Sequence, residues 1–337
     1  MKFKIYQQFE TNQLIETNRF KSSFCQVMTE IGQQISLSPT SSLIKRIAPA
    51  IPHFKESVTA LRDWLTYDEH TDLLTRIAWF YQGQGAYLDS SPWLEECLKI
   101  AELELGPDHS EIARGLNNLA LPYQAQGNYG DAESLFMRSL AILKQQLDED
   151  HPDVATGVNN LALLYHAQER FSEAEPMFVF SLFVRRRKLG ELHPDVAGSL
   201  NNLALLYHAQ TRFSEAEELF KQSIEILEKY LGEEHPEVAR GLNNLGATHV
   251  AQERYDEAEP ILLKALEVRQ NIALEHPDVA NSFNNLGLLY QGQRRFSEAE
   301  LYFQRSLTIR EHRLGCNHPI TQISQKNLSV VQQLQLI

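Results

Sequence analysis

Residues 193–234 have the sequence HPDVAGSLNNLALLYHAQTRFSEAEELFKQSIEILEKYLGEE, and this stretch decides the fold. Its first half carries apolar side chains at the spacing i, i+3, i+4, i+7, which places them on one face of an α-helix. These side chains are Leu200, Leu203, Ala204 and Tyr207. The sequence therefore predicts a first helix that begins near the proline of the His-Pro pair, because proline suits the first helical turn.

A second helix is predicted after a turn at residues 210–213. Ser214-Glu215-Ala216-Glu217 has the Ser-x-x-Glu form of a capping box, which marks a helix start, and Gly232 marks the end. The same form recurs elsewhere in the chain. Its first and fourth residues are Ser172 and Glu175, Asp256 and Glu259, and Ser297 and Glu300. The stretch therefore predicts a hairpin of two antiparallel helices.

This hairpin recurs with a period of about 42 residues. Each copy is marked by a histidine, in most copies followed by proline, an acidic residue and an aliphatic residue. The marker histidines are His109, His151, His193, His235, His276 and His318, with spacings of 42, 42, 42, 41 and 42. A fixed period of this size predicts an all-α fold, a right-handed α-solenoid of antiparallel helix pairs. Neighbouring marker histidines should lie roughly 16–20 Å apart, two helix widths, so they are expected to be structural and not metal ligands.

Leu200-Asn-Asn-Leu-Ala-Leu-Leu-Tyr207, followed by Ala216, Phe220 and Ser223, resembles the tetratricopeptide repeat. The usual repeat of that family has about 34 residues, and the longer unit here is similar to the repeats of kinesin light chains. The resemblance covers roughly residues 67–334. It implies an array whose concave channel holds extended peptides.

Residues 48–98 also look like the segment that precedes repeats in bacterial signalling ATPases of the nucleotide-binding, apoptosis-regulator-like class. The chain contains no G-x-x-x-x-G-K-[ST] phosphate loop, so ATPase activity is not expected. The acid pairs recur with the repeat, and no Ser, His and Asp set is unique to one place. The chain is therefore expected not to be an enzyme and to need no cofactor.

Three regions are predicted along the chain. Residues 1–66 do not repeat; helices are expected at 12–35 and 53–66, and the proline-containing segment 47–52 should interrupt any helix. Residues 67–317 should form one degenerate and five full repeats. Residues 318–337 should supply a capping helix.

Paired asparagines on the channel side of each first helix are the main candidate site, because an amide can both donate to and accept from a peptide backbone. The pairs are Asn117 and Asn118, Asn159 and Asn160, Asn201 and Asn202, Asn243 and Asn244, and Asn284 and Asn285. The second member of each pair is favoured for ligand contact. The alternative is that one member is structural and bonds a neighbouring helix.

Specificity should come from channel positions that vary between repeats. Arg114 and Arg240 could pair with ligand carboxylates or with nearby acidic residues. His166 and His208 could make the channel sensitive to pH near neutrality. Trp79 could anchor a partner, or the helices of residues 1–66 could fold over it.

Charge limits the choice of partner. The net charge is −13, and residues 1–66 carry eight Lys/Arg against five Asp/Glu, so the remaining residues have a net charge of −16. An acidic array argues against nucleic acid as a ligand. The basic run Arg185-Arg186-Arg187-Lys188 is interpreted as a solvated helix end. Three cysteines without a C-x-x-C pair, and the lack of a long apolar stretch, predict a cytosolic protein with no membrane segment.

The sequence thus predicts an adaptor or scaffold that binds a peptide or extended protein segment in its concave groove. The alternative is a regulatory or oligomerising module that acts through residues 1–66 or the convex face. The oligomeric state is open, with a monomer slightly favoured.

Overall fold

The computed structural model describes residues 2–36, 39, 41–272, 277–316 and 319–335. Within these ranges all regular secondary structure is helical. The chain divides into two compact units, residues 1–126 and 127–337. The predicted all-α fold is confirmed, because within each unit helices that are consecutive in the chain pack against one another, as in the hairpins of residues 67–105, 152–189, 194–231, 236–272 and 277–314.

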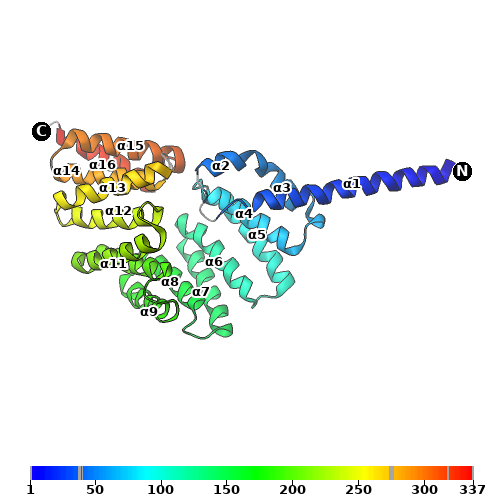
Figure 1. Cartoon of the computed structure of the whole chain (residues 1–337), viewed down its shortest axis with the longest axis horizontal. Coiled ribbons are helices and arrows are strands. Elements are labelled where there is room, and N and C mark those ends of the chain that lie inside the picture. Colours follow the sequence, from blue (N-terminus) through cyan, green and yellow to red (C-terminus); the bar gives the residue numbers. More distant parts are fainter. Residues whose placement is uncertain (1, 37–38, 40, 273–276, 317–318, 336–337) are drawn as a thin grey trace. The chain divides into compact units, whose positions relative to one another are not determined.

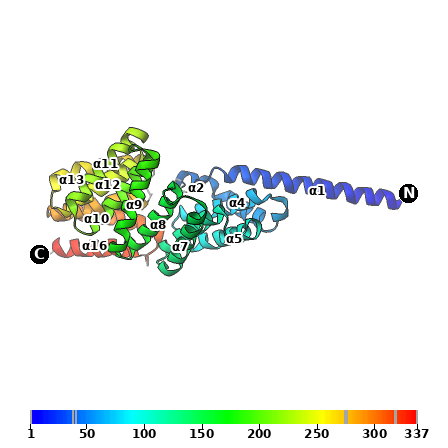
Figure 2. The same cartoon turned by 90° about the horizontal axis from the view of Figure 1, so that it is seen from below.

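The first unit contains three N-terminal helices and three helices of the repeat type. They are α1 (Lys2–Gly32), α2 (Ser41–Ile47), α3 (Ile51–Thr59), α4 (Tyr67–Gln82), α5 (Tyr87–Leu105) and α6 (Ser110–Ala125). The first half of α1 extends beyond the other helices of this unit (Figure 1, Figure 2). The predicted helix at 53–66 is shorter than expected, because α3 ends at Thr59. The segment 47–52 does interrupt the helix, with a 3₁₀ turn at Ala48–Ala50.

Residues 28–58 cover one side of α4. A cluster of buried apolar side chains joins the two segments, with Phe54 and Ile77 fully buried at its centre. Other members are Met28, Ile35, Ile44, Ile47, Ile51, Val58, Leu73, Leu74 and Phe80. The N-terminal helices therefore bury one face of α4 against apolar surface.

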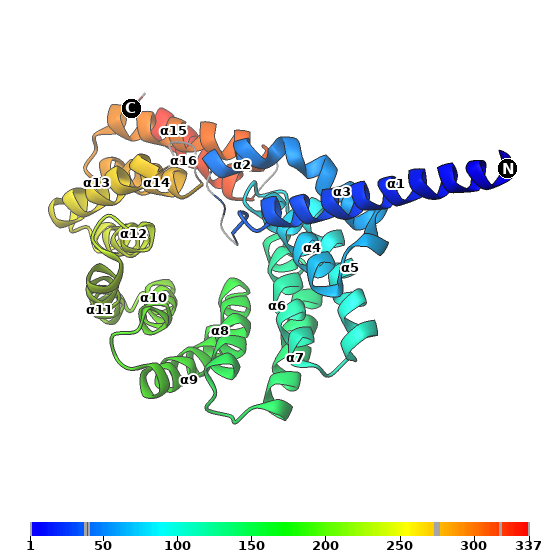
Figure 3. The same ribbon diagram turned by 45° about the vertical axis from the view of Figure 1, so that its right-hand side comes forward.

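The second unit consists of stacked hairpins and a last single helix. Its elements are α7 (Tyr129–Gln146), α8 (Pro152–Ala167), α9 (Phe171–Leu189), α10 (Pro194–Ala209), α11 (Phe213–Leu231), α12 (Pro236–Ala251), α13 (Tyr255–Ile272), α14 (Pro277–Gly292), α15 (Phe296–Leu314) and α16 (Pro319–Gln335). Figure 3 shows the pairs α10/α11, α12/α13 and α14/α15 stacked in chain order. Aromatic residues at one register position of the second helices are fully buried, and they are Phe136, Phe178, Phe220 and Phe303.

The marker histidines begin the first helices. His109, His151, His193 and His235 each occupy the N-cap position, where Nδ1 accepts a hydrogen bond from the N–H two residues later, at 3.1–3.2 Å. The side chain thus satisfies one of the unpaired N–H groups of a helix start. His276 and His318 lie outside the described residues. No group of metal-ligating side chains occurs in the described part of the chain.

The predicted capping boxes are wrong. The helices α9, α11 and α15 begin at a phenylalanine one residue before the expected serine, and the N-cap residue is an arginine whose side chain makes no cap hydrogen bond. Ser214 therefore lies inside the first turn of α11 and is exposed. The glutamates of the expected boxes have a different role, described below.

Candidate functional site

The first helices of the hairpins form the inner side of the second unit. α8 contacts α10, α10 contacts α12, and α12 contacts α14, whereas direct contacts between second helices are weaker or missing in the described hairpins. Closer spacing along the first helices bends the stack toward them. The predicted asparagines all lie on these helices, or on α6 of the first unit.

The paired asparagines of neighbouring repeats bond to each other. The Asn202 amide Nδ2 donates to Oδ1 of Asn159 at 3.2 Å, and the Asn244 amide donates to Asn201 at 3.0 Å. The same bond joins Asn327 to Asn284 at 3.0 Å. In each case the second asparagine of one repeat reaches the first asparagine of the repeat before it. The ladder of amides therefore holds successive repeats together.

Burial separates the two members of each pair. Asn159, Asn201 and Asn243 are at most 5% exposed, so these first members have no surface for a ligand. The second members are half-buried, and they are Asn118, Asn160, Asn202, Asn244 and Asn285. Asn117 and Asn284 are also half-buried. Ligand contact by the second members stays a prediction, and the alternative structural role applies to the buried first members.

The ladder is interrupted at α14. No hydrogen bond joins Asn285 to Asn243, and Oδ1 of Asn243 has no partner within the described residues. The repeat spacing is 41 residues here and 42 elsewhere. Asn285 is therefore free of the bond that occupies Asn202 and Asn244.

A hollow of about 810 Å³ lies beside Asn285 on the inner side. Its walls come from α10, α12, α14 and α16, and they include His208, Val250, Leu288, Gln291 and Leu334. Ala247 of α12 also lines this hollow. The residues in register with it in the other repeats are Leu121, Leu163, Leu205 and Leu288. Replacement of leucine by alanine removes three carbon atoms from this surface, and this accounts for part of the hollow.

The predicted channel arginines each pair with an acidic residue three positions earlier. Arg114 is 72% exposed and lies 3.3 Å from Glu111, and Arg240 pairs with Glu237. Ion pairs this exposed contribute about 0–1 kcal/mol, so a ligand carboxylate could displace them. Pairing with a ligand stays a prediction for both arginines.

The predicted histidines are half-buried against the next helix. His166 lies against Phe171, and His208 lies against Phe213 with its Nδ1 3.0 Å from Oγ1 of Thr248. Burial lowers the pKa of both imidazoles below the usual value. Both rings are therefore neutral near pH 7, and their titration lies on the acidic side.

Trp79 of α4 is half-buried. The Arg76 guanidinium lies 4.9 Å from the ring centroid, and the indole packs at the edge of the apolar cluster formed with residues 28–58. The ring also lines a hollow of about 330 Å³. Both alternatives given for this residue thus have support: the N-terminal helices cover part of the ring, and part faces a hollow.

Three glutamates of the expected capping boxes, Glu175, Glu217 and Glu259, bind an arginine of the following repeat, whereas Glu300 accepts a hydrogen bond from Gln332. Arg212 pairs with Glu215 of its own helix at 2.6 Å and with Glu175 of the preceding hairpin at 2.9 Å. Its guanidinium lies 3.7 Å from the ring centroid of Tyr207 and also donates to Gln210. The same arrangement surrounds Arg170 and Arg295, and Arg254 makes the same two ion pairs without a tyrosine. The sequence analysis did not predict these ion pairs between repeats, although an arginine recurs at this register position in four repeats.

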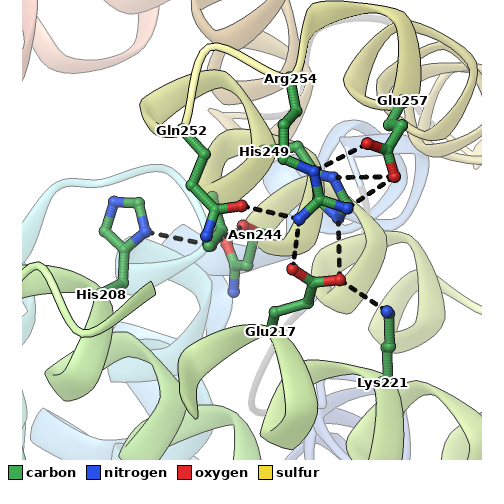
Figure 4. Close-up of polar contacts among 9 residues, drawn as sticks. His208, Glu217, Lys221, Asn244, His249, Gln252, Arg254 and Glu257 are labelled. Atoms are coloured by element: carbon green, nitrogen blue, oxygen red, sulfur yellow. Dashed lines mark hydrogen bonds and ion pairs between the residues drawn. The ribbon is translucent and has the colours of Figure 1, made fainter. Parts of the chain in front are cut away.

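Figure 4 shows the one bridge in the described array that lacks the tyrosine. His249 replaces it and is 3% exposed, with neither ring nitrogen hydrogen-bonded in the described chain. Nε2 lies 3.9 Å from Glu217, and Nδ1 lies 4.0 Å from Glu257. Burial and the charge of Arg254 lower the pKa of His249.

A second set of arginines crosses the junction between one hairpin and the next helix. Arg185, Arg269 and Arg310 are 5–8% exposed. Each donates to a main-chain oxygen near the start of the next helix and to a serine hydroxyl one turn later; the serines are Ser199, Ser282 and Ser324. The interpretation of Arg185 as part of a solvated helix end is therefore wrong. The other residues of that run pair with Glu191 and Asp150.

The repeat pattern of the tetratricopeptide family matches the chain at residues 70–145, 111–179, 153–229, 195–271, 237–312 and 278–335. The chain belongs to the tetratricopeptide repeat family. Proteins with this fold typically serve as scaffolds for interactions between proteins. A search of curated proteins finds no match.

Solved structures with similar folds include the crystal structure of BtubC (BKLC) from P. vanneervenii, which is 27% identical with a TM-score of 0.53, over 66% of this chain and 89% of that one. A putative kinesin light chain of Podosopora anserina with nearly identical TPR-like repeats is 26% identical with a TM-score of 0.49, over 60% and 97% of the two chains. A signal-transduction ATPase with numerous domains and a tetratricopeptide repeat sensor, from Pyrococcus horikoshii, is 14% identical with a TM-score of 0.54, over 87% and 43%.

Among the described residues, no helix combines the length and the apolar character needed to cross a bilayer.

Proposed function

We propose that the chain is a non-enzymatic scaffold that binds an extended segment of a partner protein along the inner side of α10, α12 and α14. The hollow beside Ala247 carries this proposal, because it combines an apolar floor with amide groups at its rim. A tetratricopeptide array has the rigid stacked helices on which such a surface can be held in place.

The hollow would take one bulky apolar side chain of the bound segment. Leu288 and Leu334 are 37% and 36% exposed, so an inserted side chain would remove both from water. Full burial of a leucine or phenylalanine side chain contributes roughly 1.5–3 kcal/mol. The amide of Asn285, which the ladder leaves unused, would bond the backbone of the segment next to that side chain.

Peptide-library selection with the full chain tests this function. Ala247→Leu restores the residue found at Leu205 and Leu288 and should occupy the part of the hollow that faces α12. We expect enriched peptides to contain a bulky apolar residue and to bind this variant at least about tenfold more weakly, the equivalent of 1.4 kcal/mol. Ala167→Leu, the same change at the exposed end of α8, is the matched control. Equal binding to both variants would remove the hollow from the mechanism.

A second candidate function is association through the outer helices. Met137, Val179 and Phe183 are 54%, 46% and 59% exposed on α7 and α9. Large exposed apolar side chains of this kind often mark an interface. Light scattering should then give an oligomer that Phe183→Glu dissociates. A wild-type chain that is monomeric at high concentration would exclude self-association.

A further inference from the structure

The junction between α5 and α6 lacks the arginine that occupies the same register position in three other repeats. The arginines are Arg185, Arg269 and Arg310. Two other repeats have leucine at this register position, Leu143 and Leu227, and α5 has Ala101. Ala101 ends at Cβ. The chain therefore supplies no side chain there that could reach the next helix.

The surroundings of Ala101 retain acceptors for a guanidinium group. At its own junction Arg185 donates from one Nη to the main-chain oxygen of Asp195, ten residues later, and from the other Nη to Thr156, 29 residues earlier. Arg310 likewise donates to Asn281, 29 residues earlier. The corresponding positions around Ala101 are Glu111 and Asp72. A carboxylate thus stands where the other repeats have a hydroxyl or an amide.

A hollow of about 330 Å³ opens at this place. The residues that line it include Asp68, Asp72, Trp79, Ala101, Glu111, Arg114 and Gly115. Its charged side chains are three carboxylates and one arginine. Arg76 also pairs with Asp72, at 2.9 Å, so three carboxylates face two guanidinium groups, and the remaining negative charge favours a positively charged ligand.

Another hollow of this chain provides the comparison. The junction of α10 and α11 with α12 contains a hollow of about 350 Å³ at the same register, beside Leu227. Its lining includes Arg185 and Arg240 together with Asp195 and Glu237, so the charges balance. Gly198 stands there in the place of Asp72. The excess of negative charge is thus a property of the hollow beside Ala101 and not of every hollow at this register.

Trp79 adds an aromatic wall. An arginine side chain is attracted to an indole face as well as to carboxylates. Arg76 already uses both groups, because its guanidinium lies 4.9 Å from the Trp79 ring centroid and 2.9 Å from Oδ1 of Asp72. This local pair shows that the Trp79 and Asp72 side chains can together hold a guanidinium.

We propose that the hollow beside Ala101 binds the guanidinium group of an arginine side chain in the partner protein. The planar group would donate to Asp72 and to the main-chain oxygen of Glu111, as Arg185 and Arg310 do at their own junctions. An ammonium group has no planar fork to reach separated acceptors, so arginine is preferred over lysine. The inference rests on the proposed function only because the arginine is taken to belong to a protein ligand. The site itself is formed entirely by α4, α5 and α6.

An arginine derivative with both termini blocked tests the site in the absence of other peptide residues. Nα-acetylarginine N-methylamide is titrated into the ¹⁵N-labelled full chain, and the indole N–H signals of Trp64, Trp79 and Trp93 are followed by NMR, with Trp79→Phe for assignment. We expect a saturable shift of the Trp79 signal. The citrulline analogue has nearly the same shape without the charge, and it should bind at least about tenfold more weakly because it loses the charge-assisted hydrogen bonds.

Two variants locate the binding. Ala101→Leu introduces the residue of Leu143 and Leu227 and should abolish the shift, while Asp72→Asn should weaken binding about tenfold. Glu104→Gln makes the same charge change at an exposed position of α5 and should leave binding unchanged. Circular dichroism checks the fold, and Asp72→Asn decides the question if Ala101→Leu does not fold.

Equal binding of the citrulline analogue, or unchanged binding by a folded Ala101→Leu chain, would overturn the site. Its failure is distinguishable from failure of the proposed function. Library peptides that bind while the arginine probe does not would retain the scaffold and reject this hollow. The converse result would retain the hollow and reject the groove of the second unit.

Discussion

α10 and α12 occupy equivalent places in neighbouring hairpins and differ at five consecutive positions. Residues 204–208 of α10 are ALLYH, and residues 246–250 of α12 are GATHV. Both helices keep the preceding LNNL and the same N-cap histidine. In this stretch α10 lines the hollow with His208 and fully buries Leu206, whereas α12 lines it with Ala247 and Val250 and contains two buried polar side chains, Thr248 and His249. The fold therefore depends on few positions, and the others are free to change the surface.

The largest effect is expected when the threonine of α12 is placed in α10. Leu206 is fully buried, and Leu206→Thr removes apolar contacts and adds a hydroxyl. We expect a loss of about 2–4 kcal/mol in the free energy of unfolding, as for other large-to-small core changes. Chemical denaturation followed by circular dichroism measures this.

Thr248 is tolerated in α12 because its hydroxyl has partners. It donates to the Asn244 main-chain oxygen at 2.9 Å and lies 3.0 Å from His208. The control is Leu205→Ala, which copies Ala247 at a half-buried position and should cost only about 1 kcal/mol. A larger loss for Leu205→Ala than for Leu206→Thr would show that the inner surface, and not the hairpin core, stabilises α10.

The asparagine ladder gives an intermediate effect that differs between the same two helices. Asn201→Ala removes the acceptor of the bond from Asn244 and leaves that half-buried amide without its partner. We expect a loss of about 1–2 kcal/mol. Asn243→Ala should cost less, because Oδ1 of Asn243 has no partner in the described structure. The two variants are compared by the same denaturation measurement, and equal losses would contradict the interrupted ladder.

The sequence predicted the hairpins because their signals are local. Apolar spacing, the His-Pro start and the glycine at the end of α11 all act within one helix, and the structure places helices there. The capping boxes show the limit of local signals. Ser214 and Glu217 have the right spacing for a cap, but Glu217 pairs with Lys221 and with Arg254, which is 37 residues away. That contact depends on how one hairpin stacks on the next.

The inner surface could be predicted only in part. Paired asparagines were visible as a repeated motif, but burial of the first member follows from the stacking of neighbouring repeats, which also brings Asn159 to Asn202, 43 residues later. The hollow beside Ala247 left a clearer sign, since alanine interrupts a column of leucines when the repeats are aligned by register. The hollow beside Ala101 is visible in the same way, because alanine stands at a register position where the other repeats have leucine or arginine.

The smallest effect is expected from His249→Tyr, and it depends on pH. Tyrosine is the residue at this position in α8, where the Tyr165 hydroxyl donates to Glu133 at 2.9 Å. A tyrosine at position 249 would donate to Glu217 in the same way. We expect a gain of about 0.5–1.5 kcal/mol at pH 7.5, the contribution of one hydrogen bond.

The sign of the pH effect follows from the groups around the ring. Burial and Arg254 lower the pKa of His249, and Lys221 acts in the same direction, while Glu217 and Glu257 oppose them. The folded chain thus binds a proton at His249 less readily than the unfolded chain, whose histidines titrate near pH 6.5. This contribution to stability is complete above about pH 6.5 and is lost as the pH falls toward the folded-state pKa.

His249→Tyr should therefore lose less stability than the wild type between pH 7.5 and 5.5. Part of the wild-type dependence should remain, because burial lowers the pKa of His166 and His208 as well. Denaturation midpoints of both chains at the two pH values measure the difference. Parallel pH profiles would show that His249 takes up its proton in the folded chain as readily as in the unfolded one. The two nearby glutamates would then outweigh burial, and the polar stretch of α12 would be as stable to acid as its counterpart in α10.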